Sequence, residues 1–464
     1  MGDLKKIISE MALSTSVHAI PNIIRTPHRK LKIIWIIFFL ISTGFCLFLV
    51  FKSITTYLEF EITTKIKYIY EPKSVFPAIT ICNKNPLLTD YAKNMLRDVT
   101  KRNNLTDLFD TTENKIESDP TLFSIVVGLG LLYAKSEYLN ETEKKKLGYS
   151  MDDMLIDCNF EVESCTSNDF VWYYDYNYGN CYRFNSGKNQ KGEPVDLKVS
   201  KQAGKFNGLK IILFLPNNDV VQTFSLSNGL HIMINNQSFL PNSDEGFDVS
   251  TGTETSVAIT KTISNQLPYP YSDCYAESTD DDESKTFDSD IVKTMKSLNM
   301  KYRQKDCFDM CFQQYIIQQC DCYLPNTYSF QNQNPCTNIL NMFCFYQKYK
   351  EYFEYYFHNV CHKLCPSECE TIKYSVSASF SDFPSKMSYN LWANSPKLMT
   401  HNKTPRTFES LKREMIYLYI YFDELKYMST RELPNLTFIE LLSNIGGTLG
   451  LFLGKCFNYI LKLN

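Results

Sequence analysis

The sequence lacks the residues and motifs on which most enzyme mechanisms depend. Only six histidines occur in 464 residues. No H-E-x-x-H, no G-x-S-x-G and no phosphate-binding glycine loop is present, so there is no candidate catalytic residue. The formal net charge is only −3, which leaves no strong electrostatic case for nucleic acid as a partner. We therefore expect neither an enzyme nor a nucleic-acid-binding protein, and no cofactor.

A long apolar run near the N-terminus predicts a membrane-spanning helix. Ile33 to Phe51 is a run of 19 residues without a charge. At 1.5 Å per residue it spans roughly 28 Å, close to the hydrocarbon thickness of about 30 Å in a bilayer. Basic residues crowd its N-terminal side: Arg25, His28, Arg29, Lys30 and Lys32. Because positive flanks stay in the cytosol, we expect the chain to enter the bilayer from that side.

A second apolar stretch, Leu436 to Leu463, predicts a second crossing. It contains more polar residues and glycines, namely Glu440, Asn444, Lys455, Asn458, Lys462, Gly446, Gly447, Gly450 and Gly454. Polar groups in a membrane usually face a bundle interior or a water-filled path, and small residues let helices approach closely. The alternative is an amphipathic helix on the membrane surface.

These two runs predict a multi-pass plasma-membrane protein with both termini in the cytosol. The expected layout is a cytosolic N-terminus over 1–31, a transmembrane helix over 32–53, an extracellular domain over 54–435 and a second transmembrane helix over 436–464. Five N-glycosylation sequons lie in the predicted extracellular part, at Asn104, Asn140, Asn236, Asn402 and Asn435.

Cysteine is abundant between the two runs. Cys46 and Cys456 lie in the apolar segments, and the other fourteen of the 16 cysteines fall between Cys82 and Cys369. Outside the cell, such an even and closely spaced set predicts up to seven disulfides. The set His358, Cys361, His362 and Cys365 has spacing that would also suit zinc, but oxidation outside the cell argues against a metal site.

The predicted extracellular part has an α+β pattern. Residues 209–215 and 229–234 are typical of strands, and 306–319 has helical spacing. Residues 80–104 and 138–154 look helical or irregular. Residues 279–285 form a charged loop, for which solvation is the first interpretation and calcium binding the alternative.

Several short motifs follow one another in a distinctive order. Phe76-Pro-Ala-Ile-Thr-Ile-Cys-Asn83 matches F-P-A-[IV]-T-x-C-N, and Tyr178-Gly-Asn-Cys-Tyr-Arg-Phe-Asn-Ser-Gly187 resembles Y-G-x-C-Y-T-F-N-S-G. The others are Leu267-Pro-Tyr-Pro-Tyr-Ser-Asp-Cys274, Cys320-Asp-Cys-Tyr-Leu-Pro325, Cys365-Pro-Ser-Glu-Cys369, Ser381-Asp-Phe-Pro-Ser385 and Leu441-Leu-Ser-Asn-Ile-Gly-Gly-Thr-Leu-Gly-Leu-Phe-Leu-Gly454. Together these motifs resemble those of the degenerin/epithelial sodium channel family, also called amiloride-sensitive sodium channels, particularly its peptide-gated and acid-sensing branches.

The resemblance implies the fold of acid-sensing channels: two transmembrane helices that flank a large, disulfide-rich extracellular domain with a β-sheet core. It implies a homo- or heterotrimer in the lipid bilayer that passes sodium ions through an amiloride-sensitive pore, which is constitutively open or opened by a ligand such as an extracellular peptide. It also implies seven bridges, Cys82–Cys181, Cys158–Cys165, Cys274–Cys369, Cys307–Cys365, Cys311–Cys361, Cys320–Cys344 and Cys322–Cys336.

The chain also departs from the family at its functional motifs. The cytosolic His-Gly gating motif is His18-Ala19 here. By the resemblance, Asn444, Gly450, Gly454, Lys455 and Cys456 are the pore and selectivity positions, yet Asn444 replaces an Asp, and Gly454-Lys455-Cys456 replaces Gly-x-Ser. A lysine in mid-membrane costs about 2.5–3.5 kcal/mol and would repel sodium. We therefore expect a truncated second span, and a non-conducting regulatory or receptor-like subunit is the alternative function.

Histidine placement bears on the opening stimulus. Acid-sensing members carry histidines just after the first span, whereas 55–75 contains none here. The predicted extracellular part has only His231, His358, His362 and His401. Clustered carboxylates offer another proton sensor where they pack together. We expect a peptide, or no ligand, to open channels that contain this chain, and we do not expect protons to do so.

Overall fold

The computed structural model describes residues 10–13, 15, 17, 19–104, 128–134, 138–216, 227–276, 289–297, 300–325, 333–395, 398 and 407–453. The chain divides into two compact units. The smaller unit comprises residues 1–65, 266–273 and 431–464, so both ends of the chain contribute to it. The larger unit comprises residues 66–265 and 274–430.

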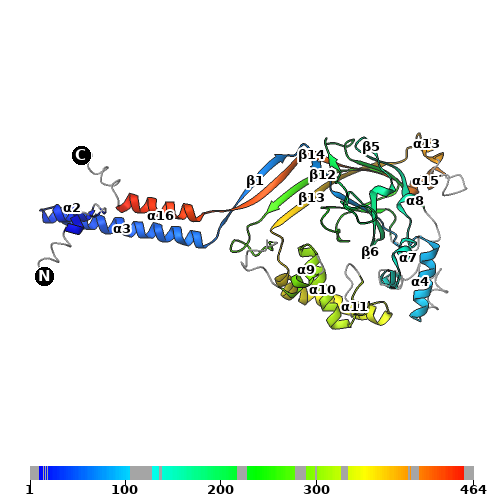
Figure 1. Cartoon of the computed structure of the whole chain (residues 1–464), viewed down its shortest axis with the longest axis horizontal. Helices are drawn as coiled ribbons and strands as arrows, with labels where there is room; N and C mark the ends of the chain where they lie inside the picture. Colours follow the sequence, from blue (N-terminus) through cyan, green and yellow to red (C-terminus); the bar gives the residue numbers. More distant parts are fainter. Residues whose placement is uncertain are drawn as a thin grey trace. The chain divides into compact units, whose positions relative to one another are not determined.

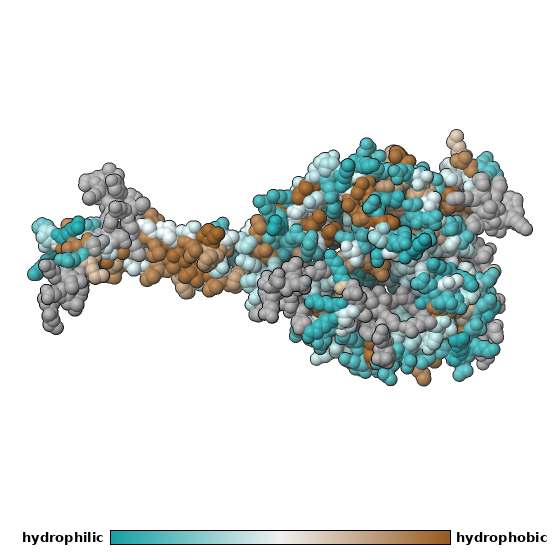
Figure 2. Space-filling view, in the orientation of Figure 1, coloured by the Kyte–Doolittle hydropathy of each residue, from teal (hydrophilic) through white to brown (hydrophobic). Residues whose placement is uncertain are grey.

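The smaller unit is built on helices α2 (Ala19–Arg25), α3 (Arg29–Leu58) and α16 (Phe438–Leu453). Helix α3 contains the predicted first span and extends beyond it at both ends. Helices α3 and α16 lie side by side (Figure 1). Apolar side chains cover much of their visible surface (Figure 2). An apolar surface of this extent on a helix pair requires an apolar environment or further partners.

Among the helices in the described part of the chain, only α3 is long and apolar enough to cross a membrane. Helix α16 is apolar but has 16 described residues, which correspond to about 24 Å of helix. The rest of the predicted second span, 454–463, lies outside the described residues. The two-span layout therefore stays a prediction.

The larger unit contains two main sheets. One has seven strands in the order β13 (Glu370–Asp382), β12 (Thr253–Asn265), β14 (Met415–Pro434), β9 (Leu209–Phe214), β4 (Leu155–Phe160) and β5 (Glu163–Ser164), with β1 (Ile62–Tyr70) also paired to β14. The other has five, in the order β11 (Phe247–Val249), β10 (Leu230–Asn235), β3 (Ala78–Asn83), β7 (Gly179–Phe184) and β6 (Phe170–Asp175). A short pair joins β2 (Ser74–Val75) to β8 (Val199–Ser200).

The two main sheets share one hydrophobic core. Ile79 and Ile81 of β3 and Phe184 of β7 pack in the same cluster as Ile211 of β9 and Leu418 of β14. Successive strand residues point to opposite faces, so Thr80 and Cys82 lie on the other face of the five-stranded sheet. That second face matters below, because polar side chains gather on it.

The expected strands over 209–215 and 229–234 are confirmed as β9 and β10. The expectation of helical or irregular structure over 80–104 is wrong for its first residues, because β3 runs to Asn83 before α4 (Asp90–Arg102) begins. The cause is a fully buried strand between two partners, β10 and β7. Its apolar residues have no exposed face that would give an alternating pattern.

Helices form the rest of the larger unit. Figure 1 shows α9, α10 and α11 grouped beside the sheets. Helix α10 confirms the expected helix over 306–319. The helical elements are α7 (Glu141–Lys145), α8 (Met151–Met154), η1 (Ser167–Asp169), α9 (Asp290–Ser297), α10 (Gln304–Cys320), α11 (Ile339–Glu351), the π-helix η3 (Tyr352–Cys361), α12 (His362–Leu364), α13 (Tyr389–Ala393) and α15 (Phe408–Glu414). The charged loop over 279–285 lies outside the described residues.

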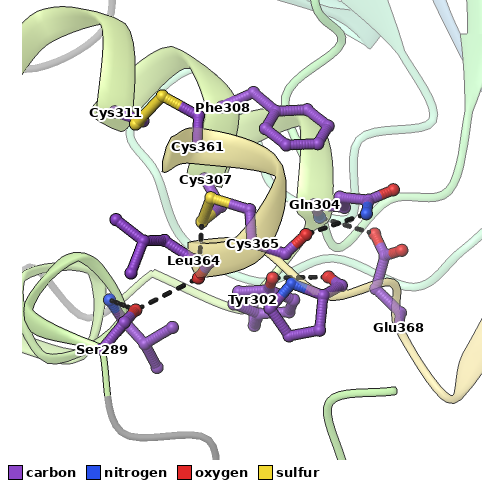
Figure 3. Close-up of a disulfide and its surroundings, with 12 residues drawn as sticks. Ser289, Tyr302, Gln304, Cys307, Phe308, Cys311, Cys361, Leu364, Cys365 and Glu368 are labelled. Carbon is purple, nitrogen blue, oxygen red and sulfur yellow. Dashed lines mark hydrogen bonds between the residues drawn. A yellow bond between two sulfur atoms is a disulfide. The ribbon is translucent and has the colours of Figure 1, made fainter. Parts of the chain in front are cut away.

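Disulfides fasten these helices to one another. Cys307 and Cys311 lie four residues apart on one face of α10, and they bond to Cys365 and Cys361, which have the same spacing (Figure 3). The other bridges are Cys82–Cys181, Cys158–Cys165, Cys274–Cys369, Cys320–Cys344 and Cys322–Cys336. These seven pairs are the ones that the family resemblance implies. Since both cysteines of the alternative zinc set are oxidised, they are not thiolate ligands.

The paired bridges on α10 predict a non-additive loss of stability. With Cys307–Cys365 intact, replacing Cys311 and Cys361 by Ala opens only a short additional loop, which should cost about 2–3 kcal/mol. Replacing all four cysteines also frees the long loop, so we expect the total loss to exceed the sum of the two single-bridge losses by about 1–2 kcal/mol. Denaturant unfolding of the full chain in detergent measures this difference.

The control is the Cys158–Cys165 bridge, which closes a loop of sequence separation 7 and has no parallel bridge beside it. Its removal should add to either α10 variant without extra loss. Strict additivity within the α10 pair would show that the two bridges do not constrain the same loop.

Candidate functional site

Helix α16 begins with a capping box. Thr437 Oγ1 accepts a hydrogen bond from the Glu440 backbone N–H at 3.3 Å, and the Thr437 N–H donates to Glu440 Oε2 at 2.8 Å. A carboxylate at this position satisfies free N–H groups and lies at the positive end of the helix dipole. The box therefore explains why an acidic residue stands at the start of an apolar stretch. It fixes the first turn of the helix that carries the predicted pore residues.

One face of α16 packs against α3. Leu441, Ile445, Thr448 and Phe452 are buried or half-buried and recur at helical spacing. Ser42 Oγ on α3 donates to the Phe452 carbonyl oxygen at 2.8 Å. The ring of Phe452 also lies 5.4 Å from that of Phe45, between centroids. Packing and this hydrogen bond fix which side of α16 faces α3.

The opposite face of α16 carries mainly small residues, with Ile439 on the same side in the first turn. Ser443, Gly446, Gly447 and Gly450 are all exposed. A Cβ atom built on any of these three glycines would have no neighbouring heavy atom within 4 Å. Packing within the described part of this single chain would therefore allow larger side chains at these three positions. We call these four residues the small-residue face.

The predicted pore and gating residues fall in different places. Gly450 belongs to the small-residue face, whereas Asn444 is exposed on a flank of the helix. Six residues separate them, which places them about 120° apart around the axis. Ala19 begins α2. His18, Gly454, Lys455 and Cys456 lie outside the described residues, so their roles stay predictions.

The predicted glycosylation sites differ in their surroundings. Asn104 and Asn140 are exposed, and Asn236 is half-buried. Asn435 is exposed, but its Nδ2 donates to Glu61 Oε2 at 2.9 Å, close to the start of α16. Asn402 lies outside the described residues. Glycosylation at all five positions stays a prediction.

A second group of interest is a carboxylate cluster at the start of α10. Arg303 holds Asp306 through two hydrogen bonds, from Nη2 at 2.6 Å and from Nε at 3.1 Å. The same guanidinium reaches Glu245 Oε2 at 3.4 Å. Asn242 Nδ2 donates to Asp309 Oδ2 at 2.8 Å. Acidic side chains from α10 and from the 242–245 loop therefore share one basic residue.

Contacts on the other side of α10 fix this cluster. Gln304 N–H donates to Glu368 Oε1 at 3.0 Å, and Gln304 Nε2 donates to the Cys365 carbonyl oxygen at 2.9 Å (Figure 3). The Tyr302 hydroxyl donates to the Pro366 carbonyl oxygen at 2.6 Å. The first turn of α10 is thus held by disulfides and hydrogen bonds together, which keeps the carboxylates close despite their repulsion.

The electrostatic consequence is strongest at Asp309. Burial, and then the charges of Asp306 and Asp244, raise the pKa of Asp309 to about 7. Burial also raises the pKa of Asp306, although its hydrogen bonds from Arg303 act in the opposite direction. Carboxylates of this chain therefore pack together at the start of α10. Their positions were not identified from the sequence, where the only signal was two acids three residues apart on a helix.

The histidines near this cluster differ in their exposure. His358 and His362 are exposed, and the ring of His362 lies 6.4 Å from that of Phe308 on α10, between centroids. His231 is buried, stacks on Tyr178 at 4.3 Å between ring centroids, and contacts Asp248 Oδ1 and the Glu245 carbonyl oxygen at 2.8 Å each. His401 lies outside the described residues. Among the carboxylates of this cluster, Asp306 and Asp309 have raised pKa values.

Comparison with known proteins places the chain among ion channels. A family model described as amiloride-sensitive sodium channel matches residues 11–457. Epithelial sodium channel subunit gamma-2 from Xenopus laevis is 24% identical over 547 aligned residues, which cover 97% of this chain and 78% of the relative. Acid-sensing ion channel 1A from Danio rerio is 26% identical over 471, covering 97% and 86%. A solved proton-activated chloride channel has a TM-score of 0.32 at 7% identity, covering 91% of this chain and 93% of its own, and this similarity is too low to carry an argument.

These matches first define the class of protein: the chain is an ion-channel subunit and not an enzyme. Since the family model covers nearly the whole chain, the chain belongs to the amiloride-sensitive sodium channel family. The family resemblance in the sequence motifs is thereby confirmed, and a channel subunit is favoured over the receptor-like alternative.

The raised pKa of Asp309, about 7, predicts that stability falls as pH rises. Above pH of about 4 the unfolded chain loses this proton while the folded state retains it until about pH 7. Ionised Asp309 therefore destabilises the fold at pH 8 and not at pH 4. We expect Asp309→Asn to raise the free energy of unfolding at pH 8 by on the order of 1 kcal/mol or more relative to its effect at pH 4.

Thermal unfolding of the full chain at both pH values measures this difference. Asp98→Asn, which changes an exposed carboxylate on α4, is the matched control and should show no such dependence. If Asp309→Asn changed the free energy of unfolding by the same amount at both pH values, the raised pKa of Asp309 would be contradicted.

Proposed function

We propose that this chain contributes to the pore of a trimeric sodium channel in the plasma membrane, with residues 1–31 in the cytosol and the larger unit outside the cell. The observation behind this proposal is the exposed small-residue face of α16, which lies opposite α3 and which we assign to the pore. In the proposed arrangement, α3 covers one side of α16 and the bulky apolar side chains on the flanks meet lipid or neighbouring helices. Three small-residue faces then surround the ion path.

The distribution of side chains on α16 supports this orientation. Large apolar residues such as Leu442, Leu449 and Leu451 are exposed on the flanks of the helix. Lipid favours such side chains, whereas a face of Ser and Gly contributes little apolar contact. Polar and small positions in a membrane usually face protein or a water-filled path. Gly450 is therefore a better candidate than Asn444 for the side that faces the pore axis.

We propose further that a peptide or no ligand opens the channel. The buried and hydrogen-bonded state of His231 supports this view, because a proton sensor must exchange protons with the solvent. The carboxylate cluster around Asp309 is the feature that would favour the opposite result. A direct test of proton activation therefore has to accompany the test of conduction.

Conduction is tested by amiloride-blockable sodium current in cells that express the chain alone and together with a related subunit. A bulky side chain on the small-residue face should obstruct the path, so we expect Gly450→Leu to reduce this current at least tenfold. Leu451→Phe also adds bulk, but about 100° away around the helix, and should leave most of the current. Equal effects of the two variants, at equal surface expression, would contradict the proposed pore face.

The same cells test the opening stimulus by a step of external pH from 7.4 to 5. We expect no large inward sodium current on this step, because residues 55–75, just after the first predicted span, contain no histidine that could act as a proton switch. A family member activated by protons serves as the positive control. A large, fast and amiloride-blockable current that Asp309→Asn diminishes would overturn the proposal and assign proton sensing to the cluster.

A further inference from the structure

The second face of the five-stranded sheet contains a buried arginine that has no acidic partner among the described residues. Arg183 on β7 is only 6% exposed. Its Nη2 donates to three backbone carbonyl oxygens, those of Asn236 at 3.0 Å, Gln237 at 3.3 Å and Phe239 at 2.6 Å. No carboxylate within the described part of the chain forms an ion pair with it. A buried charge is ordinarily paired with an opposite charge.

Three hydrogen-bonding groups beside this charge are buried and also lack a partner among the described residues. They are Arg183 Nε, Thr80 Oγ1 and Tyr173 OH. Thr80 is the direct cross-strand neighbour of Arg183. Tyr173 lies on the adjacent strand β6, with its hydroxyl close to that of Thr80 and to the charge of Arg183. A hydrogen bond between the two hydroxyls would use only one of their O–H donors, so one O–H and the Arg183 Nε–H would still need an acceptor. Buried polar atoms in folded proteins nearly always have a partner, which indicates a missing group here.

The charges around this position favour an anion. Burial lowers the pKa of Arg183 to about 10, and the positive charge of Arg303 acts in the same direction, so the guanidinium remains charged at neutral pH. The nearby carboxylates are already engaged: Asp306 and Glu245 with Arg303, and Asp175 with Ser243. Burial raises the pKa of Tyr173, so its hydroxyl is protonated and can donate.

The motif that residues 178–187 resemble has Thr at the position of Arg183. A variant with Thr there removes the charge and keeps the residue that this motif carries.

We infer that a small monovalent anion of the size of chloride binds beside Arg183, where it accepts hydrogen bonds from Arg183 Nε–H, Thr80 O–H and Tyr173 O–H. Water alone would satisfy the hydrogen bonds but would leave the buried charge uncompensated. Asn235 Oδ1, on β10 of the same sheet, is also buried without a partner among the described residues. It is an acceptor, so it needs a donor such as a water molecule next to the anion. This inference does not depend on the proposed pore.

Anion dependence of stability tests the site. The full chain in detergent is unfolded by heat in sodium chloride and in sodium gluconate of equal ionic strength, since gluconate is too large for an enclosed site. We expect the wild-type Tm to be higher in chloride by about 2 °C or more. Arg183→Thr, which installs the family's residue, should lose this shift. Arg97→Thr removes an exposed arginine on α4 and should retain it.

Bromide provides a test that needs no variant. Anomalous diffraction from crystals of the wild-type chain grown in bromide should place one peak within hydrogen-bonding distance of Arg183 Nε. The inference is overturned by an equal wild-type Tm in the two salts, or by a chloride shift that persists in Arg183→Thr. It is equally overturned if ordered water only, or a carboxylate of the chain itself, occupies the position beside Nε.

Discussion

The pairing of β14 is the constraint on which most of this structure depends. The strand runs from Met415 to Pro434 and lies between β9 and β12 in the seven-stranded sheet. Ile416, Leu418 and Ile420 alternate into the core that both sheets share. A slip of one residue would expose this entire set, so the register is strongly specified.

This constraint bears on function because β14 leads directly to α16. Strand β14 ends at Pro434, and the capping box at Thr437 starts the helix. The chain passes between its two units at only four points, near residues 65, 265, 273 and 430. Any effect of a ligand on the larger unit that travels along the backbone to α16 must use one of these connections.

Much of the fold could be predicted from sequence because its signals are local. The uncharged run from Ile33 to Phe51 predicted most of α3, and the helical spacing of α10 predicted that helix almost to its ends. Motifs shared with the family implied the cysteine pairing. In contrast, β3 was missed because a strand buried on both faces has no alternating pattern, and its neighbours β7 and β10 come from far along the chain.

The candidate sites were predicted less completely, since they depend on contacts between distant segments. Asn444 and Gly450 were both assigned to the pore from motif positions, but the helix places them on different sides. The carboxylate cluster joins α10 to a loop some sixty residues earlier, so no local pattern could reveal it. The motif comparison shows Arg183 where the motif has Thr. That this arginine is buried, and therefore needs a partner for its charge, is visible only in the structure.

Arg303 and Arg183 show two solutions to the same physical problem in one larger unit. Arg303 is compensated by Asp306 and Glu245, and the disulfides of α10 keep that ion cluster in place. Arg183 has three carbonyl dipoles but no formal negative charge among its described neighbours. Dipoles can stabilise a guanidinium, yet they leave its Nε–H and the adjacent hydroxyls unsatisfied. A mobile anion would supply both the charge and the acceptor. The fold therefore tolerates an arginine here on the condition that the surrounding solution provides its partner.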